Sequence, residues 1–227
     1  MARRLAHALL AAALLTGVLA PSASAGFTVV QPTEKYAGKT YGQWSAAWWQ
    51  WAANISEPSS PITDATGKNC GVNQKGAVWL LAGNAGGSTT RRCTVPQDKA
   101  VLFPVINAEC SSVEGNGTTD AELRGCATSF MDQVTETAAS VDGTPIELGT
   151  PPNQSHFRFQ SPLFTITFAP NNGFGIPAGT GSSVADGYWV LLRPLAAGKH
   201  SVDFHANAPT LGFELSLHYA LTVTQNR

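Results

Sequence analysis

The sequence predicts a mainly β protein: an antiparallel β-sandwich, of the jelly-roll or immunoglobulin-like kind, decorated by two α-helices. Short apolar runs bounded by glycine, proline and other turn residues recur along the chain. The last of these runs alternates apolar and polar residues over a full strand, and only two segments combine helical periodicity with a start signal. Many short strands and few helices indicate a sandwich.

The N-terminal segment, residues 1–25, has the three parts of a secretory signal peptide. A pair of arginines is followed by an apolar run and by the small-residue cleavage site Ala23–Ala25. The apolar run is too short for a bilayer-spanning helix, and no later stretch is long enough. We therefore expect a single domain over residues 26–227, either secreted or periplasmic, with no membrane span in the mature chain.

Composition excludes two classes of protein. Lys and Arg total 14 and Asp and Glu total 15, so the formal net charge is −1, whereas nucleic-acid binders carry a basic surface. Hydrophobic residues make up 43% of the chain, near the norm for globular proteins, and charged residues only 13%, which argues against a disordered chain. We expect no nucleic-acid partner.

All four cysteines follow the predicted leader. An even number of cysteines in an exported chain predicts two disulfides. Three pairings are open, and we favour the pairing of sequence neighbours, in which each bond contributes on the order of 3 kcal/mol. A zinc site is the alternative, but no CxxC or paired-histidine spacing accompanies these residues. The favoured pairs are Cys70 with Cys93 and Cys110 with Cys126.

The first predicted helix is unusually rich in tryptophan. Thr40 and Gln43 match a capping box at its start, and prolines at positions 58 and 61 end it. Its apolar residues share one side of a 3.6-residue period. They are Tyr41, Trp44, Trp48, Trp51, Ala52 and Ile55.

Three interpretations of this helix are open. Indole faces stack on sugar rings, so the helix would serve as a glycan platform. A membrane-surface helix is disfavoured, because the polar face carries no Lys or Arg. We favour the third interpretation, a core role, because each large aromatic side chain buries about 150–250 Å². If any residue of this helix contacts a ligand, we expect it to be Trp49, which sits off the apolar stripe.

Turn signals divide the rest of the chain into strands and one further helix. A second capping box, Thr119–Glu122, predicts a helix that reaches about Ser140. Pro104 cannot donate a ladder hydrogen bond, so we expect it at a sheet edge or a bulge. Gly83–Thr90 and Ala169–Ser183 are expected to be loops. The predicted strands are Gly76–Ala82, Lys99–Ile106, Thr144–Leu148, Phe157–Gln160, Leu163–Phe168, Tyr188–Leu192, Lys199–Ala206 and Gly212–Thr224.

The last two strands place several polar residues on the face away from the core. If Ala206 pairs with Phe213, these residues would meet and would together supply ligands for a metal ion. A solvated polar face with a cross-strand pair is the alternative, and we favour it. We expect no cofactor, with calcium or another divalent metal as the alternative. The four residues are His205, Asp203, Glu214 and His218.

Three segments carry a likeness to other proteins: the run Tyr41–Trp51, the segment Cys70–Cys93 with its internal run Val78–Gly83, and the run Ala185–Trp189. In these segments the chain resembles a group of uncharacterised secreted bacterial proteins that share a YGxWSAxWWQW helix motif. The resemblance implies export and a bacterial source. It implies no activity, so it assigns no catalytic residue.

Motifs that would announce an enzyme are absent from the sequence. It contains no GxSxG elbow, HExxH, P-loop or GxGxxG. We therefore expect a non-catalytic binding or surface-interaction protein, whose partner is a glycan or a cell-surface protein. The alternative is a secreted hydrolase acting on polysaccharide or ester bonds, for which the linear sequence names no pair of carboxylates across a cleft. The sequence leaves the oligomeric state open.

Overall fold

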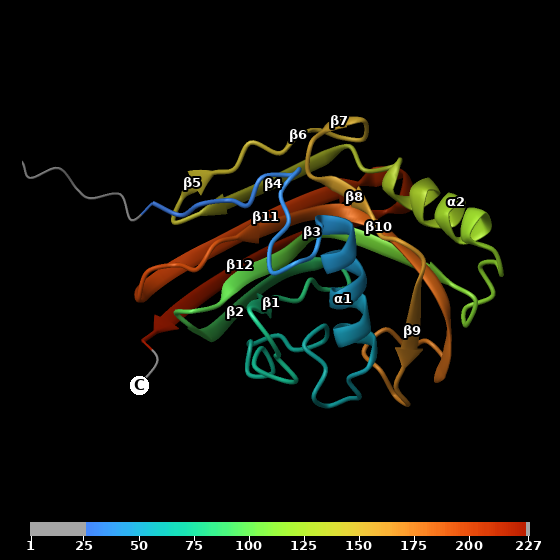
Figure 1. Ribbon diagram of the computed structural model, residues 1–227, viewed down its shortest axis with the longest axis horizontal. Helices are drawn as coiled ribbons and strands as arrows, with labels where there is room; N and C mark the ends of the chain where they lie inside the picture. The colour runs from blue at the N-terminus through green and yellow to red at the C-terminus, as the bar shows by residue number, and fades with distance from the viewer. Residues whose placement is uncertain (1–25, 226–227) are drawn as a thin grey trace, which may run out of the picture.

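The computed structural model describes residues 26–225, so the predicted leader lies outside the described residues. Within this range the chain forms a β-sandwich with two helices, which confirms the predicted fold class. Long twisted strands run across the molecule, with α1 lying against them and α2 at one end (Figure 1). No helix in residues 26–225 is long and apolar enough to cross a membrane.

Two five-stranded sheets build the sandwich. The first sheet has the strand order β1-β3-β10-β8, and β9 also pairs with β10. The second sheet has the order β2-β12-β11-β4-β5. The first sheet contains β1 (Val78–Leu80), β3 (Ala100–Ser111), β8 (Arg158–Gln160), β9 (Phe164–Phe168) and β10 (Gly179–Leu192). The second contains β2 (Gly87–Pro96), β4 (Glu136–Val141), β5 (Thr144–Pro145), β11 (Gly198–Ala208) and β12 (Phe213–Thr224).

Most strand pairs are antiparallel, but both sheets are mixed. Edge strand β1 runs parallel to β3, and edge strand β2 runs parallel to β12. A short pair, β6 (Gly149–Thr150) with β7 (Gln154–Ser155), lies outside both sheets, and the 3-10 turn η1 (Pro209–Leu211) joins β11 to β12. The two parallel edges distinguish this sandwich from the purely antiparallel one that the sequence predicts.

The two sheets face each other through an aromatic core. Phe103 of β3 stacks on Phe204 of β11, with ring centroids 5.1 Å apart. Phe103 pairs with Val190 of β10, so both side chains point toward the second sheet. Trp189, which precedes Val190, points the other way. Its ring centroid lies 5.6 Å from that of Trp48 of α1. The first sheet is therefore the middle layer, covered on one face by the second sheet and on the other by α1.

Both helices begin at the predicted capping boxes. The helix α1 spans Tyr41–Ala53 and the helix α2 spans Asp120–Met131. At each start the N-cap threonine accepts from a backbone N–H, and the side chain three residues on accepts from the backbone N–H of the threonine. Capping is a local interaction, so the sequence alone is enough to locate it.

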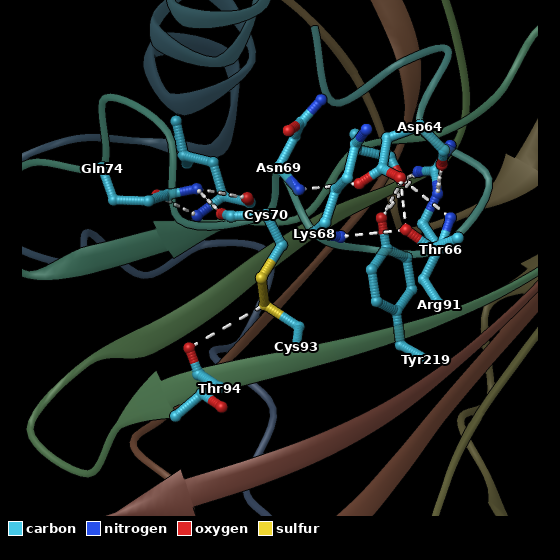
Figure 2. Close-up of a disulfide and its surroundings, with 12 residues drawn as sticks. Asp64, Thr66, Lys68, Asn69, Cys70, Gln74, Arg91, Cys93, Thr94 and Tyr219 are labelled. Atoms are coloured by element: carbon cyan, nitrogen blue, oxygen red, sulfur yellow. Dashed lines mark hydrogen bonds between the residues drawn. A yellow bond between two sulfur atoms is a disulfide. The ribbon is translucent and has the colours of Figure 1, made fainter. Parts of the chain in front are cut away.

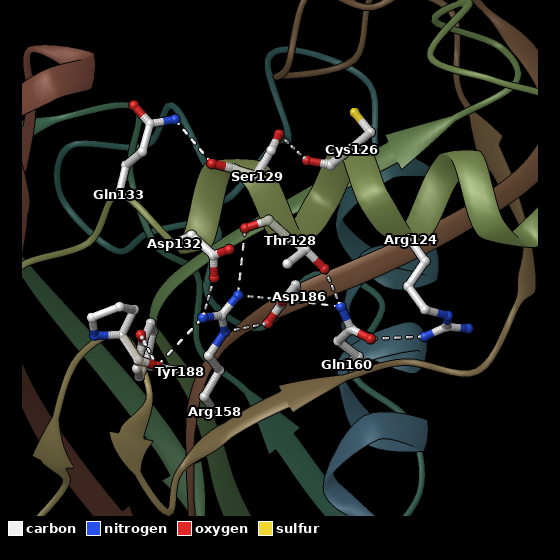
Figure 3. Close-up of polar contacts among 11 residues, drawn as sticks. Arg124, Cys126, Thr128, Ser129, Asp132, Gln133, Arg158, Gln160, Asp186 and Tyr188 are labelled. Atoms are coloured by element: carbon white, nitrogen blue, oxygen red, sulfur yellow. Dashed lines mark hydrogen bonds and ion pairs between the residues drawn. The ribbon is translucent and has the colours of Figure 1, made fainter.

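The helix α2 is anchored to the first sheet by a disulfide. A polar network, shown in Figure 3, holds it as well. Arg158 of β8 contacts Asp186 of β10 at 2.8 Å and Asp132, just past the helix, at 2.7 Å. Asp186 is only 1% exposed, so its charge depends on this guanidinium. The disulfide joins Cys110 of β3 to Cys126 of α2, as predicted.

A buried arginine fixes the long segment between α1 and β1 (Figure 2). Arg91 of β2 is 2% exposed. Two residues further along β2, Cys93 forms the predicted disulfide with Cys70 of this segment. The guanidinium donates to five oxygens: the carbonyls of Ile62, Asp64, Ala82 and Gly83 and the hydroxyl of Tyr219, at 2.6–3.0 Å.

Three of the predicted elements, one helix and two loops, are wrong in their extent. The second helix ends at Met131, not near Ser140, because residues 136–141 form β4 and pair with β11. The expected loop Gly83–Thr90 contains the start of β2, and the expected loop Ala169–Ser183 contains the start of β10. In each case pairing with a distant strand overrides the local preference of Ala and Gly, which are depleted in strands.

Pro104 lies at an irregularity of β3, as expected. It pairs with Trp189 of β10, whereas Ile106 pairs with the neighbouring Tyr188. Val105 is thus the extra residue of a bulge, which accommodates the missing N–H of the proline.

A second buried charge-bearing group is Glu109 of β3, which is 8% exposed. Burial, with a smaller contribution from the neighbouring Glu114, raises the pKa of its carboxyl to about 9, although a hydrogen bond from the hydroxyl of Ser183 acts in the opposite direction. Glu109 is therefore protonated in the folded protein at neutral pH.

Replacing Arg91 with methionine should destabilise the fold strongly, because several buried carbonyls would lose their donors. Each such loss costs about 1–3 kcal/mol, so we expect a loss of at least about 3 kcal/mol. For a domain of this size that corresponds to a fall in Tm of about 6–12 °C. The exposed neighbour Arg92, changed to methionine, is the matched control and should leave Tm nearly unchanged; equal effects in thermal unfolding would contradict the structural role of Arg91.

Stability should fall as the pH rises from about 5 to 9, owing to Glu109. An unfolded glutamate releases its proton near pH 4.5, whereas folded Glu109 holds it to about pH 9. Across that window the folded state binds more protons, so raising the pH favours unfolding by up to about 1.4 kcal/mol per pH unit. Glu109→Gln should flatten the curve of Tm against pH, whereas the exposed Glu147→Gln should not. Parallel curves for wild type and Glu109→Gln would refute the assignment.

Candidate functional site

The outer face of the second sheet holds the candidate site. Buried and exposed residues alternate along β11 and β12, so one face packs on the core and the other points outward. Outward side chains of four adjacent strands line a groove of about 460 Å³, which we call the outer groove. They are Ser88 and Thr90 of β2, Ser216 and His218 of β12, Asp203 and His205 of β11, and Ala138 and Ser140 of β4, with Pro145 of β5 at the edge.

The strand register arranges these side chains in two rows across the sheet. The first row is Ser88, Ser216, His205 and Ala138. The second row is Thr90, His218, Asp203, Ser140 and Pro145. His205 lies between Ser216 and Ala138, and His218 lies between Thr90 and Asp203. Each imidazole therefore has small side chains on both sides along its row.

Each histidine of the outer groove has a polar partner on the paired strand. His218 Nδ1 lies 2.6 Å from Asp203 Oδ1. An ionised carboxylate only accepts, so Nδ1 carries the hydrogen and Nε2 is left as an acceptor when the ring is neutral. His205 Nδ1 lies 3.0 Å from Ser216 Oγ. The groove thus presents acceptors and donors side by side.

Two exposed carboxylates flank His205 at one end of the groove. Glu136 Oε2 lies 3.9 Å from His205 Nε2, and Glu214 Oε1 lies 4.0 Å from Nδ1. These distances are too long for hydrogen bonds, so the carboxylates act on the ring through their charge alone.

The predicted face of the last two strands is right, but the predicted register is wrong. Ala206 pairs with Leu215 and not with Phe213. The strands run further than expected, and a tight connection of η1 and Gly212, which has a left-handed φ of 62°, closes the hairpin. A shift of two residues leaves every side chain on its face. It gives new partners: Asp203 faces His218, and His205 faces Ser216.

The shifted register separates the four residues of the predicted metal site into pairs. His205, Asp203, Glu214 and His218 share the outer face, but each histidine ring bonds to a different partner. In residues 26–225, no three His, Cys, Asp or Glu side chains are grouped so that they could hold a metal ion.

The tryptophans of α1 lie in the core, as the favoured interpretation expects. Trp44, Trp48, Trp49 and Trp51 are at most 9% exposed. The Trp49 ring lies edge-on to Trp48 at 5.3 Å and against Phe174 at 5.0 Å. A sugar ring would have to displace Phe174 to stack on Trp49, so the helix offers no open glycan platform.

Sequence reasoning missed half of the outer groove. Ser88 and Thr90 belong to β2 but fall in the segment Gly83–Thr90, which was expected to be a loop. Ala138 and Ser140 belong to β4 but fall in the expected extension of the second helix. The only local signal for β2 is a short alternation in which Arg91, like the cysteine and valine that follow at every second position, points inward.

The chain matches no known protein-family model, and no curated protein matches it either. A solved structure that it resembles is that of PbICP-C in complex with falcipain-2, with 11% sequence identity, a TM-score of 0.27 and coverage of 66% of this chain and 100% of that chain. At this TM-score the likeness carries no argument, so the proposals below rest on the geometry of the chain itself.

The burial of the tryptophans predicts the fluorescence of the native protein. Indoles in apolar surroundings emit at shorter wavelength than indoles in water, and iodide cannot reach them. We expect a blue-shifted emission that iodide quenches several-fold less than it quenches the urea-unfolded chain. A native spectrum that is red-shifted and fully quenched would contradict the burial of α1.

Proposed function

We propose that the protein is a non-catalytic binding protein that takes a glycan in the outer groove. The observation that carries the proposal is the pair of rows in which Asp203–His218 and His205–Ser216 stand side by side in an open groove. Sugar hydroxyls donate and accept at the same time, and this groove supplies both kinds of partner.

The groove also offers apolar surface for the C–H faces of a sugar ring. Ala138 and Pro145 lie at one side of it, and the methyl group of Thr90 lies at the other. A binding site with a few polar groups on a largely apolar bed is typical of small-ligand sites.

The site is built on paired strands rather than on loops. Its side chains come from β2, β12, β11 and β4, whose backbones are hydrogen-bonded to one another along the sheet. Beneath the outer groove lie Phe204 and Leu217, both buried in the sandwich core. A site held in this way loses little conformational entropy on binding, which supports recognition of a flexible ligand.

A hydrolase is the second candidate, and the hydrogen bond between Ser216 and His205 favours it. Acyl transfer also needs backbone N–H groups that are free to hold an oxyanion. Ser216 stands in the middle of β12, between β2 on one side and β11 on the other, and the backbone there is engaged in the sheet. The groove is therefore better suited to binding than to acyl transfer.

Export is part of the proposal. The two disulfides fit an oxidising compartment, where thiols of a small domain are oxidised and remain so. We propose that the protein is secreted or periplasmic, where a glycan or a cell-surface protein is within reach.

Titration calorimetry against soluble cell-wall and capsular polysaccharides tests the glycan proposal. Asp203→Ala and His205→Ala should each weaken binding by about 10- to 100-fold, because each removes a hydrogen bond involving an ionisable group worth about 1.5–3 kcal/mol. Thr222→Ala, outward on β12 but outside the groove, is the control and should bind like the wild type.

Two outcomes would contradict the proposal. One is the absence of binding to every glycan, and the other is equal binding by the Asp203→Ala and control variants. Release of product from a polysaccharide or ester substrate, lost in Ser216→Ala, would instead support the hydrolase.

A further inference from the structure

One end of the outer groove is acidic. Next to the row that contains Ser216 and His205, the register places Glu214 of β12, Asn207 of β11 and Glu136 of β4 side by side on the outer face. The two glutamates lie on either side of β11, so their backbones are two strand spacings apart, about 10 Å. Both side chains are exposed, and their carboxylates lie 4.0 and 3.9 Å from the His205 ring. They therefore border the groove at this end.

Neither of these carboxylates has a fixed counter-charge. Among residues 26–225, the only basic side chain within 4.0 Å of Glu136 or Glu214 is His205. Within the same described range, the groove lining includes no Lys or Arg, and its one acidic residue is Asp203. Three carboxylates thus share this part of the face, and the positive charge near them is limited to what the imidazoles carry when protonated. This end of the groove therefore attracts cations.

The basic residues of the same face lie at its other end. Arg92 of β2 pairs with Ala220 of β12, six residues along that strand from Glu214, and Lys199 lies further on in the same direction. At about 3.3 Å per residue, the Arg92 row is about 20 Å from the row of carboxylates. The outer face is therefore polarised, and a cationic group of a ligand would lie at the end that Glu214 borders.

The groove combines this charge with the surface that a sugar needs. Two exposed glutamates alone would only be a solvated part of the surface. Here they border a groove of about 460 Å³ that offers hydrogen-bond partners and apolar surface to a sugar. Among glycans, the cationic ones carry free amino groups, and each ammonium group donates up to three hydrogen bonds, whereas carboxylates accept. N-acetylation removes this charge, and a uronic acid reverses it.

We propose that the outer groove selects glycans that carry a free amino group, and that Glu136 and Glu214 hold the ammonium group. This inference rests on the proposed function, because it names the class of glycan that the same groove takes. The carboxylates serve selectivity more than affinity, since they also disfavour acidic glycans by like-charge repulsion.

Two disaccharides that differ only in N-acetylation test this selectivity. Chitobiose has a free amino group on each ring, and di-N-acetylchitobiose has neutral amides in their place. In titration calorimetry at neutral pH and low salt, chitobiose should bind about 3- to 10-fold more tightly, because exposed ion pairs are individually weak. The preference should shrink in about 0.5 M salt, which screens exposed charges.

Exchange of the two glutamates for glutamine removes their charge and keeps their size. Glu136→Gln and Glu214→Gln should each lower the affinity for chitobiose, and the double variant should lower it to the affinity for di-N-acetylchitobiose. Affinity for the acetylated sugar should stay within about 2-fold of the wild type. Glu34→Gln is the matched control for each single variant. It removes the same charge from an exposed residue of the N-terminal segment, which bonds to β10 of the first sheet, and should bind both sugars like the wild type.

Several outcomes would overturn the selectivity. They are equal binding of the two disaccharides to the wild type, tighter binding of a polyuronate than of chitobiose, and a preference for chitobiose that survives in the double variant. Each of these leaves the glycan proposal standing as long as some glycan binds and Asp203→Ala weakens that binding. If no glycan of any charge binds, the proposed function fails and this inference fails with it.

Discussion

The structure depends on one buried cation. Within the described residues 26–225, Arg91 pairs with no carboxylate; five oxygens, four of them backbone carbonyls, take its hydrogen bonds. Only a guanidinium offers this many donors in a fixed plane. The acceptors belong to the segment before β1, the loop after it, and β12, so a single side chain of an edge strand joins the second sheet to the chain on both sides of β1. The disulfide between Cys70 and Cys93 lies two residues further along β2 and reinforces the same junction.

The parts of the fold that could be predicted are those decided by neighbours in the sequence. Two capping boxes, the bulge at Pro104, the disulfide pairs and the burial of the tryptophan helix all follow from local pattern. The strands β2 and β4 could not be found in the same way. Their Gly and Ala residues are depleted in strands, and β2 and β4 become strands because β12 and β11 offer them an edge.

The candidate site shows the same division. Alternation along the last two strands places His205 and His218 outward, and no register error by an even number of residues can change that. Which residues meet depends on the length of the hairpin connection, where Ala208 and Phe213 are already paired. About half of the residues that line the outer groove come from β2 and β4. They could not be predicted, because the two strands themselves could not be predicted from local pattern. Arg91 gave no sign of its role, because its acceptors, four backbone carbonyls and the hydroxyl of a distant tyrosine, leave no trace in a sequence.

The parallel pairing of β2 with β12 also has a consequence for the order of folding. Arg91 and Tyr219 are 128 residues apart, and β12 is the last strand of the chain. A contact between residues so far apart in the sequence closes a large loop. The entropy cost of closing that loop slows folding. The edge of β2 therefore stays unpaired during synthesis until β12 has left the ribosome. A chain shortened by a dozen residues at its C-terminal end would lose the strand between β2 and β11, and with it the continuity of the second sheet.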